Sequence, residues 1–167
     1  MPVPVYLICS ESGATDENTK LTSFFNLVEK LRVMRMEAQP GQVIRANLTP
    51  LRLSAYWMRE ETDADDTRFE VQFVGMFPNG PPEIELTRGE FQFVGPFARL
   101  NVVGLQFNQF FGPGILRIEA RIRRIGEETW LNRMSYPIVL EEFQPGLSGE
   151  AAAPPHPPTP PISSPDA

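Results

Sequence analysis

The sequence predicts an all-β protein, an antiparallel β-sandwich of about eight strands, immunoglobulin-like or C2-like, followed by a disordered C-terminal tail. Two observations predict this fold. Apolar side chains fall at every second position in several segments, the spacing that places them on one face of a pleated strand. Clusters of proline, glycine and asparagine separate most of these segments, as in the turns between short strands.

The clearest alternation runs from Leu116 to Ile122, where aliphatic residues alternate with arginine and glutamate. The same pattern recurs from Leu51 to Met58 and from Phe69 to Phe73. Each of these segments predicts a strand with one face packed and the other in water. Five further strand candidates are Val3 to Cys9, Glu83 to Leu86, Glu90 to Val94, Leu100 to Phe107 and Trp130 to Leu140.

Two connections bear on the topology. Arg124 to Glu128 is short enough for a hairpin loop, and Gly126 can supply the positive φ that such a loop needs, so the last two strands should pair antiparallel. Leu21 to Val33 fits a helix face nearly as well as a strand face. We favour a strand there because the neighbouring segments are strands.

The composition divides the chain of 167 residues into a sandwich domain, residues 1–145, and a tail rich in proline, alanine and serine, residues 146–167. The tail holds overlapping P-x-x-P patterns, Pro155 to Pro158 and Pro158 to Pro161, which an aromatic groove could bind as polyproline II. Because no basic residue flanks them, we favour a passive extension over a recognition element.

Charge and composition exclude several classes of partner. The net charge is −6 and the pI is near 4.9, so we expect neither nucleic acid nor an anionic membrane as a partner. The apolar N-terminal run stops at Glu11, too short for a signal peptide or a membrane span, and we expect a cytoplasmic protein. Cys9 is the only cysteine and should be a small core residue.

The sequence points away from catalysis. His156 is the only histidine and lies in the tail, where nothing can hold it rigidly, so we expect no histidine-based active site, no enzyme and no cofactor. The acidic run between two strands offers calcium ligands in Glu60, Asp63, Asp65 and Asp66. It lacks the ligand spacing of an EF-hand, and a solvated loop is the favoured interpretation.

Aromatic residues gather after one of the candidate strands. Phe107, Phe110 and Phe111 stand beside asparagine and glutamine, a mixture that suits a protein interface or sugar stacking. Packing of these rings in the core at the base of a loop is the commoner arrangement. We keep the three residues as interaction candidates.

The first thirty residues carry a resemblance. Leu7-Ile8-Cys9 is followed by Asp16, by Thr19-Lys20-Leu21 and by the run from Phe25 to Leu31. With the strand, hairpin and strand from Ile115 to Leu140, the chain resembles, over roughly residues 3–143, a family of small uncharacterised bacterial β-sandwich proteins, a domain of unknown function. The resemblance implies the sandwich fold and no catalytic residues. The proline-rich tail departs from the family pattern.

These observations predict a non-catalytic binding or scaffolding module that presents loops or a sheet edge to a protein partner. The alternative is a calcium- or carbohydrate-binding sandwich that uses the acidic loop or the aromatic segment. The oligomeric state stays open.

Overall fold

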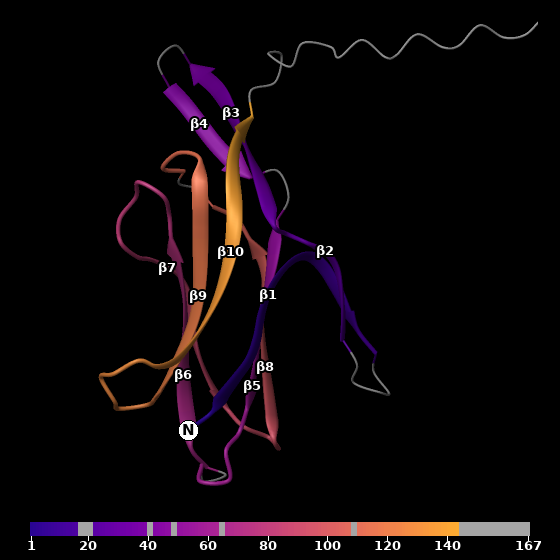
Figure 1. Cartoon of the computed structure of the whole chain (residues 1–167), viewed down its shortest axis with the longest axis vertical. Helices are drawn as coiled ribbons and strands as arrows, with labels where there is room; N and C mark the ends of the chain where they lie inside the picture. The colour runs from indigo at the N-terminus through magenta and orange to yellow at the C-terminus, as the bar shows by residue number, and fades with distance from the viewer. Residues whose placement is uncertain (17–21, 40–41, 48–49, 64–65, 108–109, 144–167) are drawn as a thin grey trace, which may run out of the picture.

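A computed structural model describes residues 1–16, 22–39, 42–47, 50–63, 66–107 and 110–143, with the backbone alone for residues 34–39, 42–47, 132 and 143. These residues form ten strands and no helix (Figure 1). The strands are β1 (Val3–Thr15), β2 (Thr22–Leu27), β3 (Lys30–Gln39), β4 (Gln42–Asn47), β5 (Leu51–Met58), β6 (Arg68–Met76), β7 (Ile84–Gln92), β8 (Phe97–Leu105), β9 (Gly114–Arg124) and β10 (Leu131–Phe143).

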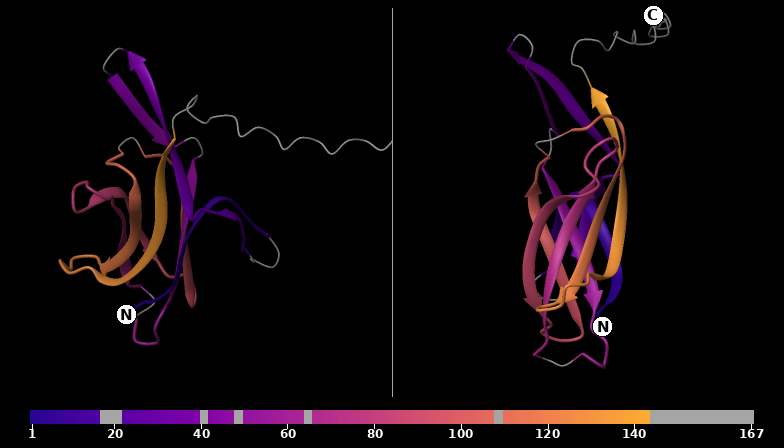
Figure 2. Two further views of the ribbon diagram at one scale, coloured as in Figure 1. Left: turned by 45° about the horizontal axis from the view of Figure 1, so that its top comes forward. Right: turned by 90° about the vertical axis from the view of Figure 1, so that its left-hand side faces the viewer.

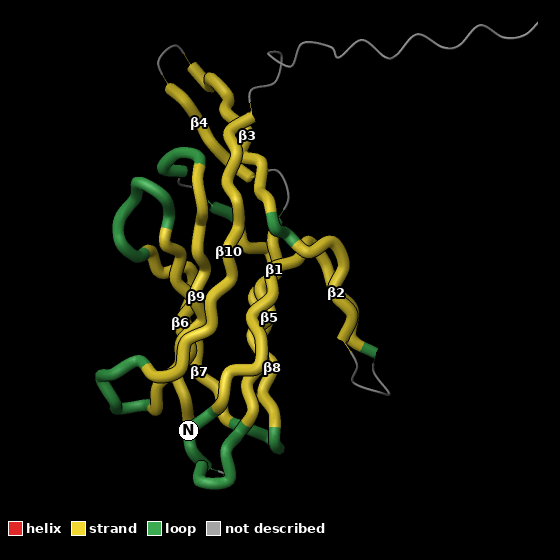
Figure 3. The backbone as a smooth tube through the Cα atoms, viewed as in Figure 1, coloured by secondary structure: helices red, strands yellow, loops and turns green. Residues whose placement is uncertain are grey.

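The strands form two sheets. A four-stranded sheet has the order β2-β1-β5-β8, and a six-stranded sheet has the order β4-β3-β10-β9-β6-β7. The six-stranded sheet is curled, and Figure 3 draws the strands of both sheets as a backbone tube. Figure 2 gives two further views of this curl. All neighbouring strands pair antiparallel except β3 and β10, which pair parallel from Lys30 opposite Val139 onward.

One hydrophobic cluster joins the sheets, and the predicted alternation supplies its centre. Leu116, Ile118 and Ala120 of β9 are fully buried, as are Leu53 and Trp57 of β5. Full burial of such a large apolar side chain contributes about 1.5–3 kcal/mol. The alternation therefore identified the inward face of both sheets correctly.

Several boundaries differ from the sequence prediction. The segments Glu83 to Leu86 and Glu90 to Val94 are not separate strands, because β7 continues through the polar residues between them while pairing with β6. Within the segment Leu21 to Val33, for which a strand is favoured, residues 22–27 belong to β2 and residues 30–33 to β3, and residue 21 lies outside the described residues. The expectation of purely antiparallel sheets is wrong for the pair β3 and β10.

The break between β2 and β3 carries the chain from one sheet to the other. The Val28 N–H donates to the Cys9 carbonyl at 2.9 Å in the four-stranded sheet, and the Val139 N–H donates to the Glu29 carbonyl at 2.8 Å in the six-stranded sheet. The chain itself, bonded to β1 at Val28 and to β10 at Glu29, therefore connects the two sheets at this point. We call this side the closed seam, formed by β1, β3 and β10.

The predicted hairpin between the last two strands is confirmed. Gly126 has a φ of 92° and the Glu127 N–H donates to the Arg124 carbonyl at 3.1 Å, so β9 and β10 pair antiparallel. No helix within the described ranges is long and apolar enough to cross a membrane. The expected tail, with Pro155, Pro158 and Pro161, lies outside the residues that the structure describes.

Candidate binding groove between two edge strands

The side of the molecule opposite the closed seam is open. Among the described strands, β7 ends the six-stranded sheet and β8 ends the four-stranded sheet. Inward apolar residues of these two strands, Leu86 and Ile84 on β7 and Leu100 and Val102 on β8, pack against the core but stay partly exposed. We call this side the open seam, formed by β7 and β8.

Two hollows follow one another along the open seam. The first, of about 270 Å³, is lined by residues 84–86 of β7, residues 105–107 at the end of β8, and Phe77. The second, of about 260 Å³, is lined by residues 87–90 of β7 and 99–102 of β8 above Val71 and Phe73 of β6. Because β7 rises in number as β8 falls, the two edges run antiparallel across a shallow groove that both apolar and polar residues line.

The predicted aromatic segment forms one end of this groove. Phe107 is buried and lines the first hollow, with its ring 5.4 Å from that of Phe77. Phe111 packs edge-on against the same Phe77 ring at 5.5 Å, and Phe110 and Phe111 are partly buried against the core. The segment therefore packs as core at a loop base, and Phe107 alone of the three lines the groove.

The two edges differ in their charged residues. β7 carries Glu85, Arg88 and Glu90, whereas the only charged residue of β8 is Arg99. Charged side chains on an edge strand discourage pairing with another chain. On β8, Phe97 is 47% exposed and Val103 is 73% exposed. The edge of β8 is thus the less protected of the two.

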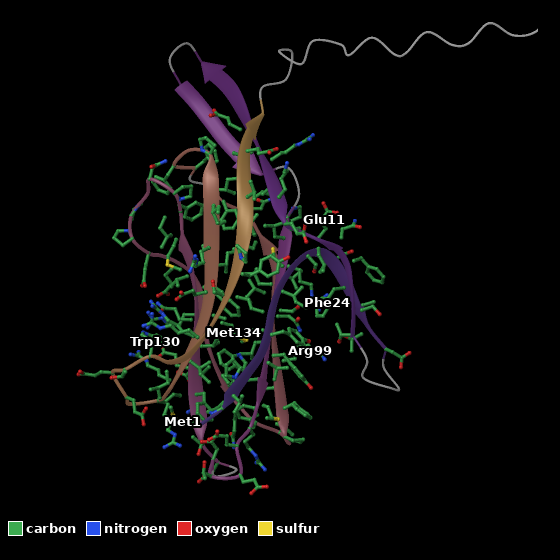
Figure 4. The ribbon with its side chains drawn as sticks, viewed as in Figure 1. Met1, Glu11, Phe24, Arg99, Trp130 and Met134 are labelled. Atoms are coloured by element: carbon green, nitrogen blue, oxygen red, sulfur yellow. The ribbon has the colours of Figure 1, made fainter. Side chains whose placement is uncertain are left out.

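Arg99 is held in place by neutral groups. Its guanidinium donates to the Tyr6 hydroxyl at 3.2 Å and to the Thr22 hydroxyl, and it lies 5.0 Å from the centre of the Tyr56 ring. Figure 4 labels Arg99 near Phe24 of the hairpin formed by β1 and β2. Among the described residues, no carboxylate pairs with Arg99.

The same hairpin covers part of the outer face of the four-stranded sheet. Thr22 of the hairpin accepts a hydrogen bond from Arg99, Phe24 packs edge-on against Tyr6 with ring centres 5.9 Å apart, and Arg52 donates to the Gly13 carbonyl at 2.9 Å. Ser54, which the alternation predicts to be wet, is fully buried on this face and donates to Asn101 at 2.6 Å. This hydrogen bond satisfies the buried Ser54 hydroxyl.

The acidic loop is engaged within the chain. The Asp63 carboxylate is almost fully buried, 2.9 Å from the Arg124 guanidinium and 3.3 Å from the Met1 ammonium. The Glu60 carboxylate lies 2.6 Å from the same ammonium. Desolvation lowers the pKa of the Met1 ammonium, but its hydrogen bonds to Glu60 and Asp63 outweigh that effect and raise the pKa overall.

The two remaining calcium candidates are Asp65 and Asp66. Asp66 is exposed, and Asp65 lies outside the described residues. Within the described part of the chain, no group of three or more acidic, cysteine or histidine side chains is placed to hold a metal ion. Glu60 and Asp63 bind two cationic groups of the chain instead, which gives the loop a structural role.

A second polar cluster on the outer face of the six-stranded sheet was not predicted. The Trp130 ring is surrounded by guanidinium groups 4.4, 5.4 and 5.8 Å from its centre, those of Arg123, Arg121 and Arg88. Each arginine also forms an ion pair with at least one glutamate. Arg123 pairs with Glu70, Arg121 with Glu83, and Arg88 with Glu70 and Glu85. Hydrogen bonds from these arginines lower the pKa values of the three glutamates. The cluster therefore holds β6, β7 and β9 together.

Cys9 offers no reactive thiol. Its side chain is fully buried beside the closed seam, and burial raises its pKa to about 12. The thiolate is the nucleophilic form of cysteine, so the group is inert at neutral pH. This agrees with the expected core role.

The chain was compared with protein-family models, curated proteins and solved structures, and none of them matches it.

Proposed function

We propose that the chain is a non-catalytic binding module that takes up an extended segment of a protein partner along the free edge of β8, in the open seam. The observation that carries the proposal is the partial exposure of inward apolar residues on both edge strands above two hollows. A strand added to β8 would cover these residues and pair with the free edge.

The size of the hollows supports a peptide over a small cofactor. At about 270 and 260 Å³, each is below the roughly 300–1,000 Å³ typical of small-molecule sites. Two shallow hollows in a row suit two side chains on the same face of one extended segment. Each backbone hydrogen bond made to β8 would add about 0.5–1.5 kcal/mol net.

The chain's own tail is a poor occupant of the groove. From Pro154 to Pro161, every residue except His156 and Thr159 is proline. Proline has no N–H to donate to a strand ladder, and the tail also lacks alternating large apolar residues. A segment from another protein fits the groove better.

We also propose the finer fold assignment, a β-sandwich of the immunoglobulin-like or C2-like type, and the kinship with small bacterial sandwich proteins that the N-terminal resemblance implies. The single core cluster drawn from both sheets supports a sandwich. For calcium or carbohydrate binding, no observation adds support, since Asp63 is already paired and Phe107 is buried.

The test is a selection of random twelve-residue peptides displayed on phage against the full chain. Val102→Lys places a charge at an inward position of the groove and should abolish enrichment, because a buried unpaired ammonium is costly. The matched control is Val103→Lys, the same change at the next residue, which faces outward and is 73% exposed. We expect the control to retain the enriched peptides.

A second variant separates a blocked groove from a protein that has failed to fold. Thr87→Lys alters the opposite wall of the second hollow from β7, where the side chain is half-buried. Circular dichroism and the melting temperature check each variant. Failure to enrich any peptide on the wild-type chain, or equal enrichment on folded Val102→Lys and Thr87→Lys, would overturn the proposal.

A further inference from the structure

We infer that the partner segment carries an acidic residue opposite Arg99, with apolar residues on both sides of it that point into the open seam. This inference rests on the proposed strand addition to β8 and names the chemistry of the segment. Three features of the described residues lead to it.

The first feature is the alternation of β8. Arg99 lies on the outer face of the four-stranded sheet, where it reaches Tyr6 and Tyr56, while Ala98 and Leu100 on either side of it pack against the core. In a strand paired with β8, the residue opposite Arg99 shares the outer face and its two neighbours point inward. The arrangement predicts the order apolar, acidic, apolar.

The second feature is the set of groups that contact the Arg99 guanidinium. Its partners among the described residues, the hydroxyls of Tyr6 and Thr22 and the Tyr56 ring, fix the direction of the guanidinium without neutralising it. Opposite charges placed directly across two strands attract each other. A carboxylate from the partner would meet a cation that is already oriented and partly buried.

The third feature is the spacing of the hollows. Along β8 they lie at residues 99–102 and 105–107. The midpoints of these two stretches are about five and a half residues apart, or roughly 18 Å at about 3.3 Å per residue of strand. An extended segment would reach both hollows with two apolar side chains six positions apart, which lie on the same face of a strand.

Self-pairing through β8 fits these features less well. The sequence of β8, from Phe97 to Leu105, contains no acidic residue, so a second copy would leave both Arg99 side chains without a carboxylate. The side chains of a second β8 could still cover the hollows. The oligomeric state of the free chain is therefore measured in the test.

The test uses three fluorescein-labelled peptides of nine residues with valine at every second position. They differ only between the first two valines, where they carry glutamate, glutamine or lysine. Binding to the full chain is followed by fluorescence anisotropy. We expect the glutamate peptide to bind about fivefold more tightly than the glutamine peptide, and the lysine peptide to bind most weakly.

Charge reversal on the protein separates pairing from general electrostatics. Arg99→Glu should reverse the order of affinity of the three peptides. Arg99→Gln should make their affinities equal, and its amide can still donate a hydrogen bond to the hairpin. The matched control is Arg117→Glu, an exposed arginine of β9 on the other sheet, which should retain the wild-type order.

The outcomes separate this inference from the proposed function. If all three peptides bind equally to the wild-type chain, and Val102→Lys still abolishes that binding, the acidic residue is wrong and strand addition stands. If no peptide binds the wild-type chain, both proposals are wrong. A dimer seen by light scattering that Val102→Lys dissociates would overturn the inference in favour of a second copy.

Discussion

The two seams between the sheets are built differently. At the closed seam, the chain crosses from one sheet to the other between Val28 and Glu29, which bond to β1 and β10 respectively, and Leu140 and Cys9 beside it are buried. At the open seam, β7 and β8 face each other across two hollows, and Leu86 and Leu100 remain partly exposed. The comparison shows that the chain itself covers the core on one side, whereas on the other side the core residues remain partly accessible to solvent.

The sharpest way to break this comparison is to truncate one leucine on each side. Leu140→Ala should cost about 2–5 kcal/mol of unfolding free energy, because it leaves a cavity in a fully packed region. Leu86→Ala should lower the free energy of unfolding by about 1 kcal/mol, because the Leu86 side chain is already partly exposed to water. Urea denaturation of both variants measures the two values. Equal losses would mean that the open seam is packed as tightly as the closed one.

A second prediction concerns the packed end of the open seam. A Cβ at Gly80 would lie 2.8 Å from the Phe111 ring and 3.2 Å from Phe77, so Gly80→Ala should cost about 1–3 kcal/mol through overpacking. The matched control is Gly89→Ala on β7, where the nearest heavy atom of Val71 is 3.9 Å away. Melting curves should place the control near wild type. A neutral Gly80→Ala would show that Phe111 is not fixed against the core.

The smallest expected effect is a loosening of β7 by acid. Hydrogen bonds from Arg123, Arg88 and Arg121 lower the pKa values of Glu70, Glu85 and Glu83, respectively, below the ordinary value of 4.5. A carboxyl group with a lowered folded pKa contributes stability above its unfolded pKa, and this stability is lost as the pH falls through the folded value. Below about pH 4.5, therefore, the ion pairs that hold β7 should weaken.

Amide hydrogen exchange across this range is the measurement. Protection of β7 should fall before that of β10, and Glu70→Gln should remove part of the pH dependence. Glu127→Gln, an exposed position in the hairpin between β9 and β10, serves as the control. Simultaneous loss of protection on β7 and β10 would contradict a selective role of the cluster.

The sequence predicted what depends on local alternation. The inward faces around Leu53, Phe73 and Ile118 followed from spacing alone. Apolar residues at every second position, repeated in several segments, predict strands that bury one face against a shared core. The continuity of β7 did not follow, since Thr87-Arg88-Gly89 resembles a turn until the pairing with β6 is known. Strand β4 was not predicted at all.

The candidate groove could be predicted only in fragments. Phe107 was identified from its aromatic neighbours, but whether a ring lines a hollow depends on strands distant in the sequence. Arg99 stands out in the sequence as a single charge within an apolar segment. Its place on an edge strand, however, could not be predicted without knowing that β8 ends a sheet. Edge position is set by pairing across the whole chain, and spacing within one segment does not encode it.

The parallel pair of β3 and β10 has a consequence for how the chain folds as it is synthesised. Lys30 pairs with Val139, so β3 leaves the ribosome long before the strand that must lie beside it. Contacts between residues so distant in sequence slow folding, whereas the hairpin of β6 and β7 can form early. The nascent chain therefore carries an unpaired β3 edge until β10 emerges, and that interval is when chaperone protection matters most.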